Sequence, residues 1–226
     1  MELFDYRADA ARVMDALLGG GIAVVPTTVG YVILGCTTPA INRIVAAKRR
    51  GASKLNAMVG CTELHAALHV LPARSRAAVR TVTERYDLPL GAVAPARLDH
   101  PMLGGLDAAV LSRTTLDGTI AMLMNAGPLL NELGRLSFEA GRPVIGSSAN
   151  MSLKGTKFRV EHIEKEVLDI AELVIDYGLM RWAAYRRSST MINVHDFTVV
   201  RHGSCFDLIA DVLRRHFDIL LAPPRD

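Results

Sequence analysis

The sequence predicts an α/β fold built on a mixed sheet, and three observations support this prediction. Short apolar runs suited to buried strands alternate with longer segments whose apolar residues recur at helical spacing. Half of the 226 residues are apolar, which is enough to form a core without disulfides or metals. Glycine and proline separate the segments, without an internal repeat or low-complexity linker. We therefore expect one domain over residues 1–226, with a core at about 8–217 and a short C-terminal tail.

The first half of the chain begins with an expected helix over residues 8–18, which Gly19-Gly20-Gly21 ends. Continuous apolar runs predict the strands that follow, at residues 22–25, 31–34 and 55–59. Periodic apolar residues predict further helices at residues 39–47, 62–68 and 73–85. The helix over residues 39–47 leads into the basic run Lys48-Arg49-Arg50, where cations complement the helix dipole.

The second half opens with residues 87–105, which are rich in proline and glycine and are expected to form a loop. Apolar runs then predict strands at residues 119–124, 143–145, 173–175, 191–194 and 198–200. Helical spacing predicts helices at residues 128–140, 160–172 and 206–217.

Charge and cysteine content exclude several classes of protein. The net charge of +3 does not indicate a dedicated nucleic-acid binder. Three cysteines without short metal-ligand spacing indicate reduced thiols and a cytoplasmic protein. No signal peptide or membrane span is expected, because charges interrupt the first 18 residues and no apolar run approaches about 20 residues. The seven histidines are not expected to form a metal site.

Small polar or basic residues cluster in four short segments, most of them following short apolar strands. The segments are Pro26-Thr27-Thr28-Val29-Gly30-Tyr31, Lys48-Arg49-Arg50, Ser147-Ser148-Ala149-Asn150 and Ser188-Ser189-Thr190. Ligands of open α/β sheets bind where strands end, and hydroxyls, amides and cations suit phosphate groups. Each segment alone is typical of a loop entry, a helix end or an N-cap. Together they predict no more than an anion or nucleotide pocket.

Taken in order, these segments resemble the YrdC/YciO family, which includes the threonylcarbamoyl-AMP synthases. The matching motifs span roughly residues 15 to 205. They are Gly20-Gly21, Pro26-Thr27 with Tyr31, Lys48-x-Arg50, Ser148-Ala149-Asn150 with Ser152, Ser189-Thr190 and Arg201-x-Gly203. The resemblance implies an open, twisted mixed sheet, mostly parallel, with flanking helices around a concave basic cavity.

The resemblance also implies an activity and a set of site residues. Relatives bind ATP and Mg²⁺ with bicarbonate and L-threonine, form threonylcarbamoyl-AMP and release pyrophosphate. Partner proteins of tRNA modification then transfer the threonylcarbamoyl group to tRNA. By this resemblance the catalytic residues are Lys48 and Arg50. The nucleotide-binding residues are Thr27, Thr119, Ser148, Asn150 and Arg201, and the substrate-binding residues are Thr28, Tyr31 and Ser189.

The chain departs from the family pattern where relatives hold threonine. Val29 replaces a threonine, Leu123 replaces the arginine that binds the threonine carboxylate, and Gly146 replaces a small polar residue. Replacing a carboxylate clamp with an apolar side chain removes a charge-assisted hydrogen bond. We therefore expect an altered amino-acid pocket, for which Arg113, or one of Arg186 and Arg187, is a candidate substitute cation.

Three functions remain open. The first is an ATP-dependent synthase of a carbamoyl-adenylate, acting on a small amine or amino acid with bicarbonate. The second is a biosynthetic paralogue that carbamoylates or adenylates another small substrate. The third is a nucleotide- or RNA-binding module without catalysis. The near-neutral charge weighs against RNA, because affinity for RNA scales with phosphate contacts.

Overall fold

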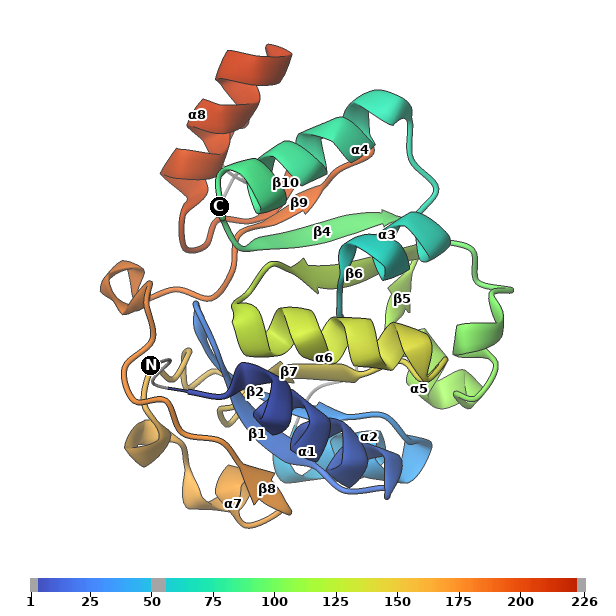
Figure 1. Cartoon of the computed structure of the whole chain (residues 1–226), viewed down its shortest axis with the longest axis vertical. Coiled ribbons are helices and arrows are strands. Elements are labelled where there is room, and N and C mark those ends of the chain that lie inside the picture. The colour runs from blue at the N-terminus through green and yellow to red at the C-terminus, as the bar shows by residue number, and fades with distance from the viewer. Residues whose placement is uncertain (1–3, 50–55, 223–226) are drawn as a thin grey trace.

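The computed structural model describes residues 4–49 and 56–222 and confirms an α/β fold with an open, twisted mixed sheet (Figure 1). The strands are β1 (Ala23–Thr27), β2 (Gly30–Gly35), β3 (Ala57–Val59), β4 (Leu90–Pro95), β5 (Thr115–Leu116), β6 (Thr119–Met124), β7 (Ile145–Ser148), β8 (Leu173–Val174), β9 (Met191–Asn193) and β10 (Thr198–Arg201). They lie in the order β10-β9-β4-β6-β3-β7-β2-β1-β8, and β5 pairs with the free part of β6.

Antiparallel pairs outnumber parallel pairs, so the expectation of a mostly parallel sheet is wrong in this respect. In the described ranges the parallel pairs are β1–β8, β3–β6 and β4–β9, whereas the other six are antiparallel. The hairpin of β1 and β2 shows one cause. Only Thr28 and Val29 separate these strands, and a two-residue connection joins antiparallel strands alone.

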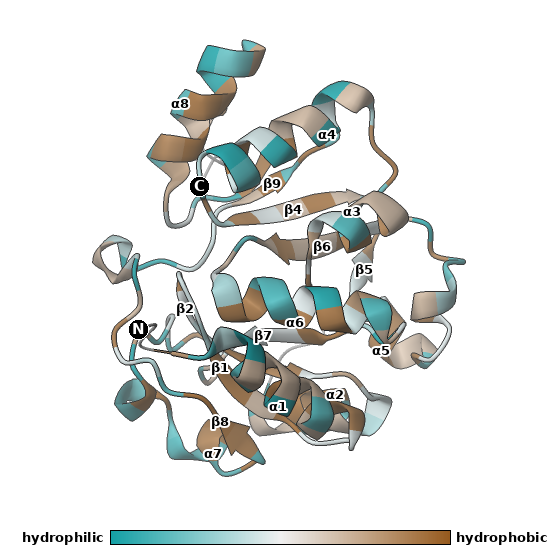
Figure 2. Ribbon diagram, viewed as in Figure 1, coloured by the Kyte–Doolittle hydropathy of each residue, from teal (hydrophilic) through white to brown (hydrophobic). Residues whose placement is uncertain are grey.

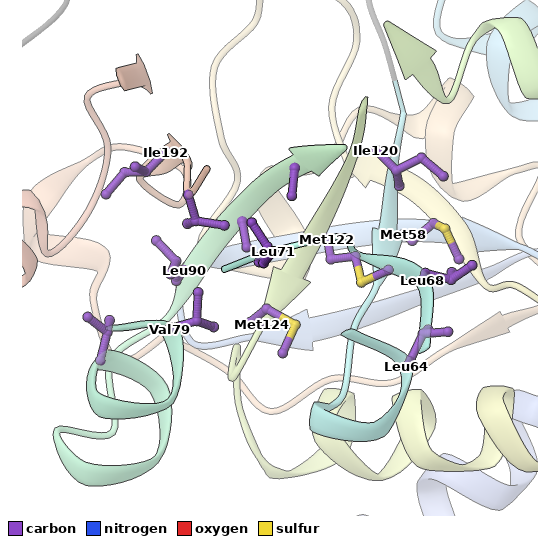
Figure 3. Close-up of a cluster of buried hydrophobic side chains, with 14 of the residues drawn as sticks. Met58, Leu64, Leu68, Leu71, Val79, Leu90, Ile120, Met122, Met124 and Ile192 are labelled. Atoms are coloured by element: carbon purple, nitrogen blue, oxygen red, sulfur yellow. The ribbon is translucent and has the colours of Figure 1, made fainter. Parts of the chain in front are cut away.

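The helices pack on the sheet through three buried clusters. The helices are α1 (Tyr6–Leu18), α2 (Thr38–Ala47), α3 (Thr62–Leu68), α4 (Ala73–Arg80), α5 (Ala108–Ser112), α6 (Pro128–Glu139), α7 (Lys165–Leu168) and α8 (Phe206–Phe217). The first cluster joins β4, β6 and β9 to α3, α4 and α8; Figure 3 shows Met58 and Met122 beside Leu64 and Leu68. The second cluster places α1 and α6 on β1, and the third places α2 and α7 against β1 and β2.

The helices are amphipathic, as their sequences predict. Figure 2 shows hydrophobic and hydrophilic bands along α6 and α8. In α1, Ala10, Val13, Met14 and Leu17 are buried, whereas the Asp5 side chain caps the first turn by accepting a hydrogen bond from Ala8 N. None of the helices in the described part of the chain has the length and hydropathy needed to cross a bilayer.

Two expected elements are wrong. Residues 87–105, expected as loop, contain the central strand β4. Gly91 of this strand has no room for a side chain, because a Cβ there would lie 2.6 Å from Met191 Cγ. Residues 160–172, expected as one helix, form only a 3₁₀ turn at Val160–His162 and the short α7, because Ile163 is extended (ψ 134°).

Candidate functional site

A cavity of about 410 Å³ lies over the central strands of the sheet. Strand β6 illustrates how its floor forms, because alternate residues face opposite sides. Thr119, Ala121 and Leu123 line the cavity, while Ile120 and Met124 belong to the core. The same cavity is lined by residues of β2, β3, β4, β7, β9 and β10.

The register of the strands arranges the cavity floor in rows. Met191, Gly91, Leu123 and Val59 stand opposite one another across β9, β4, β6 and β3. Small residues then follow on β3 and β7, where Ala57 pairs with Gly146. No side chain fits at Gly146, because a Cβ there would lie 2.0 Å from Ile33 O. The small residues Ala57 and Gly146 therefore leave this part of the cavity floor open.

Arg201 forms one wall of the cavity with two serines. Its Nε donates to Ser189 O at 3.0 Å, and its Nη2 donates to Ser189 Oγ at 3.0 Å and to Ser188 Oγ at 3.3 Å. The guanidinium is therefore held in one orientation by residues that precede β9. An oriented guanidinium beside hydroxyl groups is suited to binding an anion.

Lys48 lies behind the opposite wall. Its side chain is 1% exposed, and its ammonium donates to Ser147 Oγ at 2.8 Å and to Ser148 O. Both serines line the cavity. Lys48, expected as a catalytic residue, is therefore not among the described lining residues: α2 ends beside β7, and the lysine supports the β7 wall from within. Arg50, the other expected catalytic residue, lies outside the described residues.

Comparison with known proteins identifies the relatives of this chain. The Sua5/YciO/YrdC family model, described as "Telomere recombination", matches residues 15–203. The chain belongs to the Sua5/YciO/YrdC family. The resemblance found in the sequence motifs is thereby confirmed. A search of curated proteins finds no match.

Solved structures support the same fold for this member of the Sua5/YciO/YrdC family. A hypothetical protein, smu.1377c from Streptococcus mutans UA159, is 21% identical with a TM-score of 0.77, covering 94% of this chain and 93% of that chain. P. abyssi Sua5 complexed with L-threonine is 22% identical with a TM-score of 0.69, covering 96% and 59%. Full-length HypF in its phosphate- and nucleotide-bound form is 14% identical with a TM-score of 0.63, covering 90% and 30%.

The structure brings four of the family-motif residues together. Thr119, Ser148, Ser189 and Arg201 all line the cavity, although more than 80 positions separate the first from the last. The Thr119 hydroxyl donates to Leu116 O at 2.7 Å. Among the described lining residues, Arg201 is the cation and Asp117 the anion, so a basic cavity remains a prediction.

The other motif residues of this family member lie outside the described lining. The Thr27 hydroxyl closes the β1–β2 turn, donating to Gly30 O at 2.6 Å and accepting from Val29 N at 3.1 Å. Thr28 lies in the same turn, and its buried Oγ1 has no partner in the described ranges. Asn150 donates to Met151 O at 2.6 Å, but its buried Oδ1 has no partner among the described residues. Thr28 and Asn150 thus retain hydrogen-bonding capacity.

Tyr31 is placed in the core instead of at the cavity. It is fully buried, and its hydroxyl donates to Asp176 Oδ1 at 2.7 Å and accepts from Tyr177 N at 3.1 Å. Burial, together with the hydrogen bond to Asp176, raises the pKa of the Tyr31 phenol well above its usual range. The expected contact of Tyr31 with substrate is therefore corrected to a structural role.

Tyr31→Phe tests this structural role. The substitution leaves Tyr177 N without its acceptor, so we expect the free energy of unfolding to fall by about 1–3 kcal/mol. The dissociation constant for Mg-ATP should stay at the wild-type value. Urea unfolding and calorimetric titration measure the two quantities. Tyr86→Phe, at a tyrosine that is 44% exposed, is the matched control. Weaker ATP binding by Tyr31→Phe with unchanged stability would contradict the role.

Asn56 is a cavity residue that the sequence analysis missed. It is 2% exposed and lines the cavity, and its Nδ2 has no partner among the described residues. An unpaired buried amide is costly unless a ligand or water accepts its hydrogen bonds. The sequence feature that could have indicated Asn56 as a site residue is its position as an amide within the apolar run of residues 55–59. Arg113, a suggested substitute cation, is not among the described lining residues, and neither are Arg186 and Arg187.

His65 and His69, at the end of α3, have the His-x₃-His spacing of metal ligands. In the structure their Nδ1 atoms lie 2.8 Å apart, so the rings hydrogen-bond to each other. His69 Nε2 lies 3.1 Å from Ile120 O, and both rings are buried. Within residues 4–49 and 56–222, no group of three or more histidine, cysteine or acidic side chains is placed to bind a metal.

Proposed function

We propose that this protein binds ATP in the cavity and activates the carbamate of a small amine as a carbamoyl-adenylate. The observation that carries the proposal is a cavity with Arg201 in one wall and the buried Lys48 behind the opposite wall. Arg201 lies in the wall beside β9, and Lys48 lies behind the serines of β7. Two walls of this kind suit a ligand whose phosphates need charge neutralisation at more than one point.

Family membership and the unpaired polar atoms support a nucleotide as the ligand. Asn56 Nδ2 offers a donor and Asn150 Oδ1 an acceptor, and both are buried without partners among the described residues. HypF provides a nucleotide-bound relative of this fold, and Sua5 one with L-threonine. Mg²⁺ would accompany the nucleotide and neutralise charge on its phosphates.

The reaction requires positioning more than acid–base chemistry. The amine nitrogen bonds to the carbon of bicarbonate, and water leaves, which yields a carbamate. A carbamate oxygen then attacks the α-phosphorus of ATP as the bond to the β-phosphate oxygen breaks, which releases pyrophosphate. The protein's contribution is to align the carbamate with the phosphorus and to stabilise the developing negative charge. Arg201 and the serines beside it are the described groups oriented for that role.

Titration with Mg-ATP tests the proposal. We expect saturable heat, and at 100 times the dissociation constant a gain of about 2.7 kcal/mol in the free energy of unfolding. Arg201→Ala should weaken Mg-ATP binding by about 10- to 100-fold, because charge-assisted hydrogen bonds to phosphate are lost. Arg215→Ala is the control. Arg215 is a cation on α8, and its Nε forms an ion pair with Asp211 Oδ2, so its removal should leave Mg-ATP binding unchanged.

Pyrophosphate release separates the candidate functions. Release that depends on both bicarbonate and an amine supports the carbamoyl-adenylate reaction. Release with a small substrate but without bicarbonate would favour a paralogue that adenylates directly. ATP binding with no release under any of these conditions would favour a module without catalysis. Absence of both heat and thermal stabilisation with Mg-ATP would overturn the nucleotide assignment itself.

A further inference from the structure

One corner of the cavity, around Leu123 and apart from both Arg201 and the β7 serines, is apolar. Leu123 of β6 and Val59 of β3 stand opposite each other on its floor, and Leu130 of α6 also lines the cavity. Val59 is 2% exposed and Leu130 is 1% exposed, so both are packed in the core, and Leu123 is the half-buried side chain that faces the cavity here. Leu34 of β2, also 2% exposed, completes the group. We call Leu34, Val59, Leu123 and Leu130 the apolar end.

The register places the apolar end at a defined separation from the cation. Arg201 pairs with Met191, Met191 pairs with Gly91, and Gly91 pairs with Leu123. Three strand spacings therefore lie between the backbones of Arg201 and Leu123, which corresponds to about 14 Å. The chemical group that binds the guanidinium and the group that contacts Leu123 therefore belong to different parts of one ligand or to two different ligands.

Small residues beside the apolar end leave room for a ligand. Ala121 lines the cavity next to Leu123 in β6, and Ala57 pairs with Gly146. Neither alanine extends beyond a methyl group, and no side chain fits at Gly146. A side chain of a few carbon atoms can therefore rest on this floor against the half-buried Leu123, where apolar contact is favourable.

Resting on the function proposed above, we propose that the second substrate is a primary amine with a branched aliphatic side chain, seated at the apolar end. A hydroxyl in the same position would lose its water, while the four side chains that define the apolar end offer it no hydrogen bond. Methyl-bearing ligands should therefore be preferred to hydroxyl-bearing ligands of the same shape.

Four amines test this preference in two matched pairs. L-Valine and L-threonine differ by a methyl in place of a hydroxyl, and isobutylamine and 1-amino-2-propanol repeat the difference without a carboxylate. Binding of each is measured by calorimetry with the nucleotide present, and turnover is measured as pyrophosphate release. We expect the methyl member of each pair to bind at least about tenfold more tightly. Comparison between the pairs decides whether the ligand is an amino acid or a simple amine.

Leu123→Thr tests the site of the preference. The substitution keeps a residue that favours strands and introduces a hydroxyl beside the ligand. We expect the ratio of valine to threonine affinity to fall by about tenfold, with Mg-ATP binding retained. Leu220→Thr, at a leucine that is 79% exposed, makes the same chemical change outside the cavity and should leave the ratio at the wild-type value.

The outcomes distinguish this inference from the proposed function. If Mg-ATP binds and threonine is bound or turned over better than valine, the inference is overturned and the proposed function stands. Equal affinities within both pairs overturn it as well. If Mg-ATP does not bind, the proposed function fails, and the wild-type preference measured without nucleotide still tests whether the apolar end selects aliphatic amines.

Discussion

Lys48→Ala should reduce pyrophosphate release by about 100-fold or more while the protein remains folded. The ammonium is buried behind the two serines of β7 that line the cavity, so little water screens its charge from a ligand there. The substitution also removes the hydrogen bond to Ser148 O. We therefore expect the free energy of unfolding to fall by about 1–3 kcal/mol.

The neighbouring arginine provides the matched control for Lys48. Arg49 is exposed and follows the same helix, so Arg49→Ala removes one positive charge without removing the contact with β7. We expect Arg49→Ala to retain both the rate and the stability. Pyrophosphate release at saturating ATP gives the first quantity, and urea unfolding gives the second. A Lys48→Ala protein with full activity, or an Arg49→Ala protein with an equal loss, would remove Lys48 from the catalytic role.

The buried histidine pair should make the protein sensitive to mild acid. Ile120 O accepts a hydrogen bond from His69 Nε2, so the neutral His69 ring has its Nδ1 free to accept from His65 Nδ1. This hydrogen bond exists only while the His69 ring is neutral, because a protonated Nδ1 cannot accept. Burial lowers the pKa of His65 to about 4, with nearby Arg76 adding to the effect. Burial and the neighbouring His65 lower the pKa of His69 to about 3.

The direction of the pH dependence follows from these values. Both folded pKa values lie below the usual value of about 6.5, so the unfolded chain binds more protons as pH falls. Stability contributed by the neutral pair is therefore complete above about pH 6.5 and is lost as pH falls towards 4. Each histidine changes the free energy of unfolding by up to about 1.4 kcal/mol per pH unit in this window.

Urea unfolding between about pH 7 and pH 5 measures this effect. Replacing both rings, as in His65→Leu with His69→Leu, should flatten the pH dependence, because neither of the two titrating rings remains. His195→Leu, at an exposed histidine, should keep the wild-type slope. An equal slope in the wild type and the double variant would show that other groups cause the acid sensitivity.

The local sequence determined those features that depend on short-range patterns. Apolar runs located β1 and β6, and helical spacing located α1, α6 and α8, because each buries a continuous stripe or strand in a core. The order of the motifs identified the family, since Ser148-Ala149-Asn150 follows Lys48-x-Arg50 across nearly 100 positions. Thr119, Ser148, Ser189 and Arg201, which the motifs assigned to the site, line one cavity, and their contact with a ligand stays a prediction.

Tertiary structure decided which side of each strand faces the cavity. β1 is buried at every position and β2 at all but one, so their patterns carry no alternation from which to infer that Tyr31 faces the core. The register, which depends on partner strands distant in sequence, places Gly91 opposite Leu123 and Val59 beside it. Long-range contacts likewise bury Lys48 against β7. They also place Asn56 in the cavity lining, with an Nδ2 that has no partner among the described residues, and no local pattern predicts that position.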